Sequence, residues 1–370
     1  MLVIWSEVLG IDKDRIGIDA DFFQLGGHSL KATALISRIN LELKAAVPLV
    51  EFFKFPTVKS LSEYIIRTKE EMFTKANNLT LLKRGQDISR DGHLFFIHGG
   101  TGDVESYLEF CKHFTPQFNC WGLRVDRPEN LAPRNITIQE LANTYIKTIK
   151  KVQPHGPYYV AGWSLGGTIA FEIASQLEQK NDDISFLALI DSPAPSKNLW
   201  KNKQEFDMNS ESSFLKGLLK DKHIELDKTL NSIDKIEHFW PQMIAFLEAH
   251  GFDVELVRKI SLQLGMHILP NFSRLNFRES IDYINTIRTL NNARAAYIPV
   301  DKINTRIHYF GATKSKGQRE KLWEKYTTGG IIYNEIEGDH FSILRTPRVT
   351  ILSGKFAKAI ITGGSSTRQK

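Results

Sequence analysis

The strongest constraint on the fold is a glycine–x–serine–x–glycine pattern that follows an apolar run typical of a β-strand. The run spans residues 158–161, the pattern is formed by Gly162, Ser164 and Gly166, and a helix-like segment begins at Thr168. A strand that turns directly into a helix leaves no space for side chains beside the turn, so glycines are required there. The serine then lies on a strained backbone with its hydroxyl exposed at the edge of a sheet. An ordinary turn at Ser164 is the alternative.

Two residues that could activate this serine follow later in the chain, each after a predicted strand. Asp191 ends the apolar run 186–190, and His340 follows a Gly-Asp turn after the run 331–333. A serine hydroxyl is a weak nucleophile at neutral pH and needs a base, which a histidine supplies when an acid orients it. The order Ser164, Asp191, His340 is the order found in α/β-hydrolases.

Other residues compete for these roles. Asp339 could act as the acid, but a residue adjacent to His340 seldom points at the same edge of the imidazole ring. An exposed loop histidine is the alternative for His340 itself. His98 could act as the base, but it belongs to the glycine-rich segment 98–102, which follows the predicted strand 94–97. Such a segment brings backbone N–H groups close to a reacting carbon, which predicts an oxyanion-binding loop.

Strand and helix patterns alternate over residues 93–363, which predicts an α/β domain with a doubly wound, mostly parallel sheet. The strand candidates are the apolar runs 94–97, 120–123, 158–161, 186–190, 307–310 and 331–333. Thr137-x-x-Glu140 is a capping box that opens a helix. Helical, partly apolar stretches at 196–290 interrupt the alternation, and residues 364–370 resemble a disordered or tag-like tail.

Residues 1–68 show four short helical stretches, which predict a separate, small all-α bundle. Ser29 directly follows Gly26-Gly27-His28 and begins the second stretch. A serine in this position either caps the helix or carries a phosphodiester, which a helix N-terminus stabilises. Helix propensity does not distinguish these two alternatives.

The two predicted domains are joined by residues 69–92, which are mostly polar and lack sustained periodicity. They predict a flexible linker, although Leu79, Leu81 and Leu82 could pair at the edge of the second domain's sheet. A tether of this length would keep the two domains at high effective concentration.

The amino-acid composition indicates which kinds of binding partner to expect. The net charge of +6 is scattered along the chain, unlike the basic block of a nucleic-acid-binding surface. The two cysteines, Cys111 and Cys120, match neither a disulfide framework nor a metal-binding spacing. No apolar run reaches the length of a membrane span, and the N-terminus lacks the features of a secretory signal. We therefore expect a soluble cytoplasmic protein without metal, membrane or nucleic-acid partners.

The N-terminal segment is similar to a known family. Residues 21–30, with the flanking stretches 4–10 and 52–58, resemble the peptidyl carrier domains of nonribosomal peptide synthetases. The resemblance implies that Ser29 carries a covalent 4′-phosphopantetheine arm, attached by a phosphopantetheinyl transferase. His28 stands where the carriers of fatty-acid and polyketide systems more often have Asp, which favours a peptidyl cargo.

The second domain resembles the thioesterase domains that terminate nonribosomal peptide synthetases. The similarity lies, in order and spacing, in residues 96–100, 162–167, 190–191 and 338–341. It implies an α/β-hydrolase fold with the catalytic residues Ser164, Asp191 and His340. It also implies an oxyanion hole formed by the backbone N–H groups of Gly100 and Leu165. The insertion 196–290 would be a helical lid, with a fixed side wall as the alternative.

Together the two resemblances imply a carrier–thioesterase fragment from the end of a peptide synthetase, with adenylation and condensation domains as upstream partners. A peptidyl thioester held on Ser29 would be transferred to Ser164 and released by hydrolysis or by macrocyclisation. The alternatives are a polyketide-type carrier–thioesterase, a stand-alone hydrolase of short thioesters, and a non-catalytic carrier or docking module.

Overall fold

The computed structural model divides the chain into two compact units, Met1–Leu79 and Thr80–Lys370. The residues that the structure describes are 1–43, 45, 47, 49–66, 78–85, 92–114, 118–127, 131–195, 205–219, 226–253, 275–315 and 321–363. The expected tail 364–370 and most of the expected linker lie outside them.

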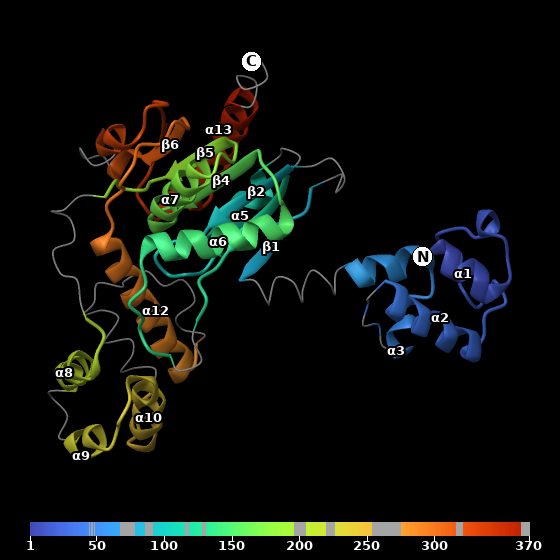
Figure 1. Cartoon of the computed structure of the whole chain (residues 1–370), viewed down its shortest axis with the longest axis horizontal. Coiled ribbons are helices and arrows are strands. Elements are labelled where there is room, and N and C mark those ends of the chain that lie inside the picture. The colour runs from blue at the N-terminus through green and yellow to red at the C-terminus, as the bar shows by residue number, and fades with distance from the viewer. Residues whose placement is uncertain are drawn as a thin grey trace. The chain divides into compact units, whose positions relative to one another are not determined.

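The first unit is helical, as the sequence predicts. It contains α1 (Leu2–Leu9), the short 3-10 helix η1 (Lys13–Arg15), α2 (Ser29–Glu42), α3 (Leu49–Phe52) and a helical stretch at 58–66 (Figure 1). Its core is aromatic at the centre: the Phe22 ring meets the rings of Trp5 and Phe52 edge to face, with centroid distances of 5.2 and 5.1 Å. All three side chains are fully buried, so this small unit has a hydrophobic core of its own.

The second unit is built on a seven-stranded sheet with the strand order β1-β3-β2-β4-β5-β6-β7. The strands are β1 (Leu79–Lys83), β2 (Gly92–Ile97), β3 (Phe118–Leu123), β4 (Tyr158–Trp163), β5 (Ile184–Ile190), β6 (Ile307–Ala312) and β7 (Ile331–Ile336). All pairs from β3 to β7 are parallel, and in the centre Phe95 of β2 pairs with Val160 of β4, which pairs with Leu187 of β5. The predicted mostly parallel α/β sheet is confirmed.

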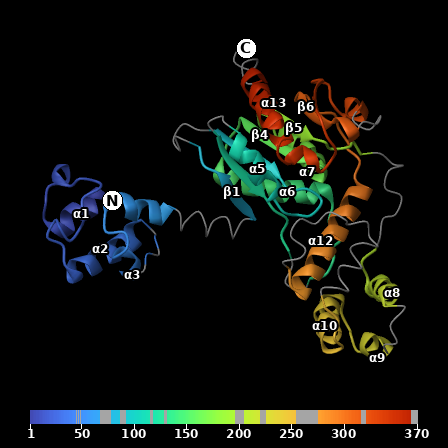
Figure 2. The ribbon, with the colours of Figure 1, turned by 180° about the vertical axis from the view of Figure 1, so that it is seen from behind.

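Helices cover both faces of the sheet (Figures 1 and 2). On one face, α5 (Ser106–His113) packs against α13 (Arg348–Gly363) around Phe110 and Phe356, whose ring centroids are 5.1 Å apart. On the other face, α6 (Ile138–Val152) packs beside α7 (Leu165–Gln179). The central strands are buried on both sides, which explains why they are apolar at successive positions and do not alternate. α6 begins at the predicted capping box: Thr137 and Glu140 bond each other's backbone N–H groups.

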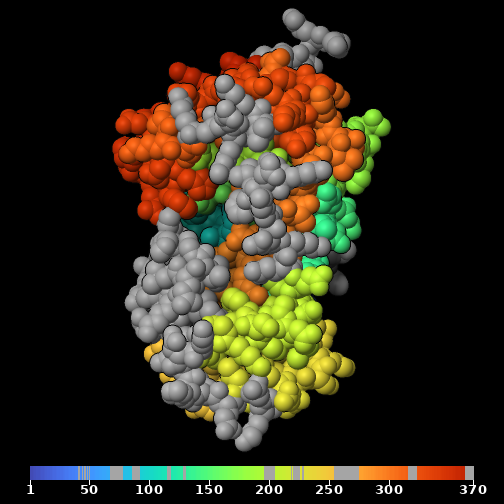
Figure 3. Space-filling view, turned by 90° about the vertical axis from the view of Figure 1, so that its left-hand side faces the viewer, coloured from blue at the N-terminus to red at the C-terminus, as the bar shows by residue number. Residues whose placement is uncertain are grey.

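The insertion between β5 and β6 is helical in its described parts. It contains α8 (Met208–Leu218), α9 (Leu226–Asn231), α10 (Ile236–Ala249) and the long α12 (Phe277–Ala296). Figures 1 and 2 show α8, α9 and α10 gathered at the end of α12 that lies away from the sheet. In Figure 3 the same helices, in yellow-green and yellow, form one end of the visible face, with the orange and red C-terminal part at the other. Trp240, Met243 and Ile284 belong to a separate hydrophobic cluster there. Because α12 ends at Ala296, the helical segment continues past residue 290, where we expected the insertion to end.

Part of the expected linker is ordered structure. Residues 79–83 form β1, the edge strand beside β3, with Leu79 fully buried and Leu82 packed against the core. The short leucine-rich run thus extends the sheet, as the pattern allowed. Among the helices described here, none combines the length and the hydropathy needed to cross a bilayer.

Candidate active site

The turn from β4 to α7 positions Ser164 at the carboxyl edge of the sheet. Ser164 has φ 56° and ψ −122°, a conformation that L-residues adopt rarely and that is characteristic of strained functional turns. A Cβ on Gly162 would overlap Gly166, and a Cβ on Gly166 would overlap the carbonyl oxygen of Ile97 at the end of β2. The steric reason for the glycine pattern that we inferred from the sequence therefore holds in the structure. The Ser164 N–H donates to the Ile190 carbonyl at 3.0 Å, which anchors the turn to β5.

Ser164, His340 and Asp191 form one hydrogen-bonded row. The distance from His340 Nε2 to Ser164 Oγ is 3.0 Å, and the distance from His340 Nδ1 to Asp191 Oδ2 is 2.7 Å. Both are within the range expected for a base that contacts its nucleophile and an acid that orients the base. The three residues are separated by up to 176 positions in the sequence, and the parallel strand ends bring them together.

Asp191 is held in place by the backbone and by a second hydroxyl. It is buried, with 3% of its side chain exposed. Its Oδ1 accepts a hydrogen bond from the Ala312 N–H at 2.9 Å, and its Oδ2 accepts one from Ser315 Oγ at 2.8 Å. The buried carboxylate thus accepts hydrogen bonds from three donors, counting His340, and these bonds stabilise its charge.

An aromatic wall lies beside the histidine. The Trp163 indole stacks on the His340 ring with a centroid distance of 4.9 Å and an interplanar angle of 28°, and Trp163 Nε1 donates to the His340 carbonyl at 3.0 Å. Phe341 meets both rings edge to face. The Trp163 N–H donates to the hydroxyl of the buried Tyr107 at 2.7 Å, and that hydroxyl donates to the Ile97 carbonyl. Sequence reasoning singled out neither Tyr107 nor Ser315, because no local pattern marks either residue.

The competing residues have other contacts. The Asp339 carboxylate accepts hydrogen bonds from the N–H groups of Phe341 and Ser342 and so caps the following turn. His98 is completely buried between the Tyr145 hydroxyl and the Gly99 carbonyl, each 2.6 Å from a ring nitrogen. Burial lowers the pKa of His98 to about 4, so this ring stays neutral at physiological pH.

The glycine-rich loop that follows β2 lies next to the serine turn. Besides overlapping the Ile97 carbonyl, a Cβ on Gly166 would overlap the His98 carbonyl, and a Cβ on Gly99 would contact the Trp163 ring at 3.0 Å. Leu165 is the first residue of α7, so its N–H is one of those at a helix N-terminus that have no intrahelical partner. The loop carrying Gly100 and the start of α7 are therefore neighbours at the same sheet edge.

Ser29 is the first residue of α2 and is exposed. The N-cap position belongs to His28, and no side-chain hydrogen bond caps the helix, so Ser29 does not act as the cap. Its neighbour Leu30 is 79% exposed. An exposed hydroxyl at the positive end of a helix dipole is chemically suited to carry a phosphodiester.

Two family models match the chain. The one described as "Thioesterase domain" matches residues 92–359, and the one described as "Phosphopantetheine attachment site" matches residues 1–65.

Similar proteins are much longer than this chain. A probable non-canonical nonribosomal peptide synthetase, CymA of Salinispora arenicola (strain CNS-205), is 25% identical over 99% of this chain but 4% of its own length. Enterobactin synthase component F of Escherichia coli (strain K12) is 30% identical over 56% of this chain and 16% of its own length. The first four curated relatives are covered over only 3 to 35% of their lengths.

Among solved structures, a holo four-domain nonribosomal peptide synthetase, AB3403, bound to AMP and glycine, is similar in fold. The similarity covers 96% of this chain and 25% of that chain, with a TM-score of 0.50 and 24% identity. Because the thioesterase model alone matches well over half of the residues, the chain belongs to the thioesterase-domain family, and a phosphopantetheine attachment domain precedes its thioesterase domain.

Proposed function

We propose that this chain is the carrier–thioesterase end of a nonribosomal peptide synthetase and releases the finished peptide. The proposal is supported by the order of the two domains and by the relatives that are themselves described as peptide synthetases. The observation that carries the chemistry is the hydrogen-bonded row of Ser164, His340 and Asp191 at the carboxyl edge of the sheet. The alternative of a non-catalytic docking module would not need such a row.

In the proposed reaction, Ser164 Oγ attacks the carbonyl carbon of an acyl thioester while His340 Nε2 accepts the hydroxyl proton. Asp191 stabilises the resulting imidazolium through Nδ1 and holds the ring in the tautomer that leaves Nε2 free to accept. His340 then donates the proton to the departing thiolate sulfur, the C–S bond breaks, and the acyl group remains on Ser164 as an ester.

We assign the oxyanion hole to the backbone N–H groups of Gly100 and Leu165. The neighbouring position of the loop after β2 and the start of α7 supports this assignment. One such donor typically contributes a factor of ~10²–10³ in rate. The aromatic wall formed by Trp163 and Phe341 would shield the ester and its imidazole neighbour from water on one side.

Release of the ester needs a second nucleophile. His340 can deprotonate a water molecule, which gives hydrolysis, or an amine or hydroxyl of the bound peptide, which gives macrocyclisation. The helices α8, α9, α10 and α12 would act as a lid that limits the access of water and so biases this choice.

Ser29 is the residue that would hold the phosphopantetheine, and its exposed position at the start of α2 fits that group. When attached, the group supplies the thiol that carries the peptide as a thioester. The implied partners are a phosphopantetheinyl transferase and the upstream adenylation and condensation domains that deliver the peptide. We place the reaction in the cytoplasm, where the thiols of Cys111 and Cys120 would stay reduced.

A fluorophosphonate probe tests the nucleophile. We expect stoichiometric labelling of the wild-type chain and no labelling of Ser164→Ala. The matched control is Ser185→Ala, which removes a partly buried serine near the amino end of β5 and should label like wild type. Equal labelling of wild type and Ser164→Ala would overturn the assignment.

A further inference from the structure

Arg127, just after β3, bridges two carboxylates from different parts of the thioesterase unit. Its Nη2 donates to Asp103 at 2.7 Å, and its Nη1 donates to Asp282 at 3.3 Å. Asp103 directly follows the glycine-rich segment 98–102 in the loop after β2, whereas Asp282 belongs to helix α12 of the insertion. The guanidinium also lies 5.1 Å from the centre of the Tyr283 ring, on the same helix. A single planar cation therefore joins the loop to the helix.

Two further contacts place α12 directly on the glycine-rich loop. The Thr101 side chain faces the Tyr283 hydroxyl and lowers its pKa, against the larger effect of burial, which raises it. A Cβ on Gly102 would lie 2.9 Å from Thr286 of α12, so only glycine permits this close approach. On the other side, Gly102 accepts a hydrogen bond from the Val125 N–H at 3.0 Å.

The electrostatics of the bridge depend on Arg127. Burial raises the pKa of both Asp103 and Asp282, and the Arg127 cation opposes this shift. Arg124 also faces Asp103, whereas Arg134 and Arg278 also face Asp282. Within the part of the chain that the structure describes, neither carboxylate forms a second ion pair, and Glu105 repels Asp103. Arg127 is thus the one direct partner that both carboxylates share.

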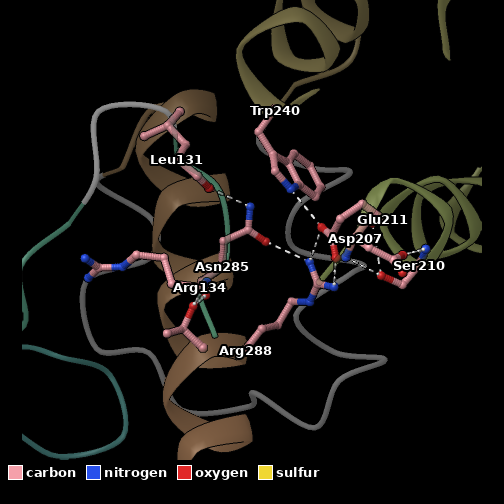
Figure 4. Close-up of polar contacts among 9 residues, drawn as sticks. Leu131, Arg134, Asp207, Ser210, Glu211, Trp240, Asn285 and Arg288 are labelled. Carbon is pink, nitrogen blue, oxygen red and sulfur yellow. Dashed lines mark hydrogen bonds and ion pairs between the residues drawn. The ribbon is translucent and has the colours of Figure 1, made fainter. Parts of the chain in front are cut away.

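The same helix is locked to the rest of the lid (Figure 4). Arg288 of α12 makes a two-pronged contact with Glu211 of α8 at 2.7 and 2.9 Å, and Glu211 accepts a hydrogen bond from Trp240 of α10 at 2.8 Å. Asn285, one turn earlier on α12, accepts from Arg288 and donates to the Leu131 carbonyl. A displacement of α8 or α10 is therefore transmitted to α12, and from α12 to the glycine-rich loop.

We propose that Arg127 is a positioning residue that sets the glycine-rich loop, and with it the Gly100 N–H, according to the position of the lid helix α12. The inference rests on the proposed function, in which that N–H stabilises the oxyanion. The position of the lid would then determine the strength of the oxyanion hole, because the Gly100 N–H is aligned only when α12 packs against the glycine-rich loop. Arg127 itself touches neither the nucleophile nor its base.

The test compares Arg127→Met, Arg127→Lys and Asp282→Asn in the full chain, with an N-acetylcysteamine thioester of a short peptide as substrate. If one oxyanion donor moves out of line, kcat falls, because a whole donor is typically worth ~10²–10³ in rate. We expect kcat to fall by about 10-fold or more in Arg127→Met with KM changed less than about twofold. Arg127→Lys, which keeps the charge but cannot bridge two carboxylates, should fall between Arg127→Met and wild type. Asp282→Asn removes only the ion pair between Arg127 and α12 and leaves the contact with the Tyr283 ring, so it tests the coupling in a milder form.

Controls separate positioning from mere loss of stability. Arg306→Met removes an exposed arginine at the amino end of β6 and should leave kcat unchanged. A double-mutant cycle combines Arg127→Met with Asp103→Asn. The kcat of the double variant should be little lower than that of either single variant, since both substitutions break the same ion pair. The melting temperature is measured for each variant.

The inference is overturned if Arg127→Met and Asp282→Asn keep kcat within twofold, or if KM rises as much as kcat falls. Ser164→Ala is assayed alongside: activity in that variant would overturn the proposed function itself.

Discussion

At the residue scale, His340 is fixed from two sides by residues that were far apart in the sequence. Asp191 holds Nδ1, while Trp163 covers the ring and donates to the backbone carbonyl of the same residue. The imidazole therefore has little freedom to rotate away from Ser164, which is the preorganisation that a general base requires.

Replacing the buried acid tests this arrangement. In Asp191→Asn we expect kcat to fall by roughly 10³–10⁴ with KM little changed, because an amide cannot stabilise the imidazolium or fix its tautomer. The matched control is Asp339→Asn at the adjacent, exposed carboxylate that caps a turn. Steady-state kinetics with a thioester substrate measure both. If Asp339→Asn were the more damaging of the two, our choice of acid would be wrong.

The buried His98 predicts how stability depends on pH. Its folded pKa of about 4 lies below the unfolded value near 6.5, so the unfolded chain binds more protons between these values. Stability therefore falls as the pH drops from 7 to 5, by about 2 kcal/mol from this residue. Urea unfolding measures the drop in the free energy of unfolding between pH 7 and pH 5. In His98→Gln this drop should be smaller than in wild type by about 2 kcal/mol. The exposed His155→Gln should unfold like wild type at both pH values. An unchanged pH dependence in His98→Gln would contradict the account.

Sequence patterns predicted some of these residues and not others. Ser164, Asp191 and His340 were identifiable because each follows a predicted strand end. Ser315 and Arg127 were not, since their importance arises from contacts with residues that are 124 and 155 positions distant. Only the tertiary fold specifies such pairs.

At the scale of elements, the β4–α7 turn leaves no space for a side chain at Gly162 or Gly166. Gly166→Ala places a methyl group against the backbone of β2, so we expect loss of soluble folded protein or a severe loss of stability. Gly217→Ala is the matched control: it lies in α8 with nothing within 4 Å of a new Cβ, and it should raise stability by roughly 0.5–1 kcal/mol through helix propensity. Thermal unfolding compares the two. A normally stable Gly166→Ala would contradict the geometry of the turn.

The helices inserted between β5 and β6 are held together by a charge pair that is almost completely buried. Only 7% of the Arg288 side chain and none of the Glu211 side chain is exposed, and the guanidinium also lies 3.8 Å from the Phe214 ring centre. Arg288→Met would leave Glu211 charged and unpaired, at a cost of about 3–5 kcal/mol.

Urea unfolding of the full chain measures this loss. The double variant Arg288→Met/Glu211→Leu should recover much of the stability, because apolar replacements of a buried pair are often tolerated. Arg278→Met, at an exposed position of α12, should change stability by less than about 0.5 kcal/mol. A wild-type midpoint in Arg288→Met would show that the pair does not hold the inserted helices together.

The elements themselves were largely predictable from the sequence, and their ends were less so. Apolar runs identified β2 through β6 because buried parallel strands leave a strong signal, and a shorter run, 331–333, identified the more exposed edge strand β7. The edge strand β1 lay inside a segment that we expected to be a linker, since a short, half-buried strand is difficult to separate from a polar connection. The insertion was expected to span about 196–290, and its last helix, α12, continues to Ala296.

At the scale of the whole molecule, the chain combines a phosphopantetheine attachment domain with a thioesterase domain. Ser29 and Ser164 lie in separate compact units. Each unit has its own hydrophobic core, so the carrier can be modified without unfolding of the thioesterase unit. In the proposed function, the covalent connection would raise the effective concentration of a thioester carried on Ser29 at the second unit and so favour transfer within one chain.

The most direct test is to follow one peptidyl group by mass spectrometry of proteolytic fragments, after a phosphopantetheinyl transferase has loaded it on the full chain. We predict that the group appears first on the peptide containing Ser29, then on the peptide containing Ser164, and finally free as a linear or cyclic product. In Ser164→Ala it should remain on the Ser29 peptide, and Ser29→Ala should not be loaded. Release from Ser164→Ala at the wild-type rate, or loading of Ser29→Ala, would contradict the account.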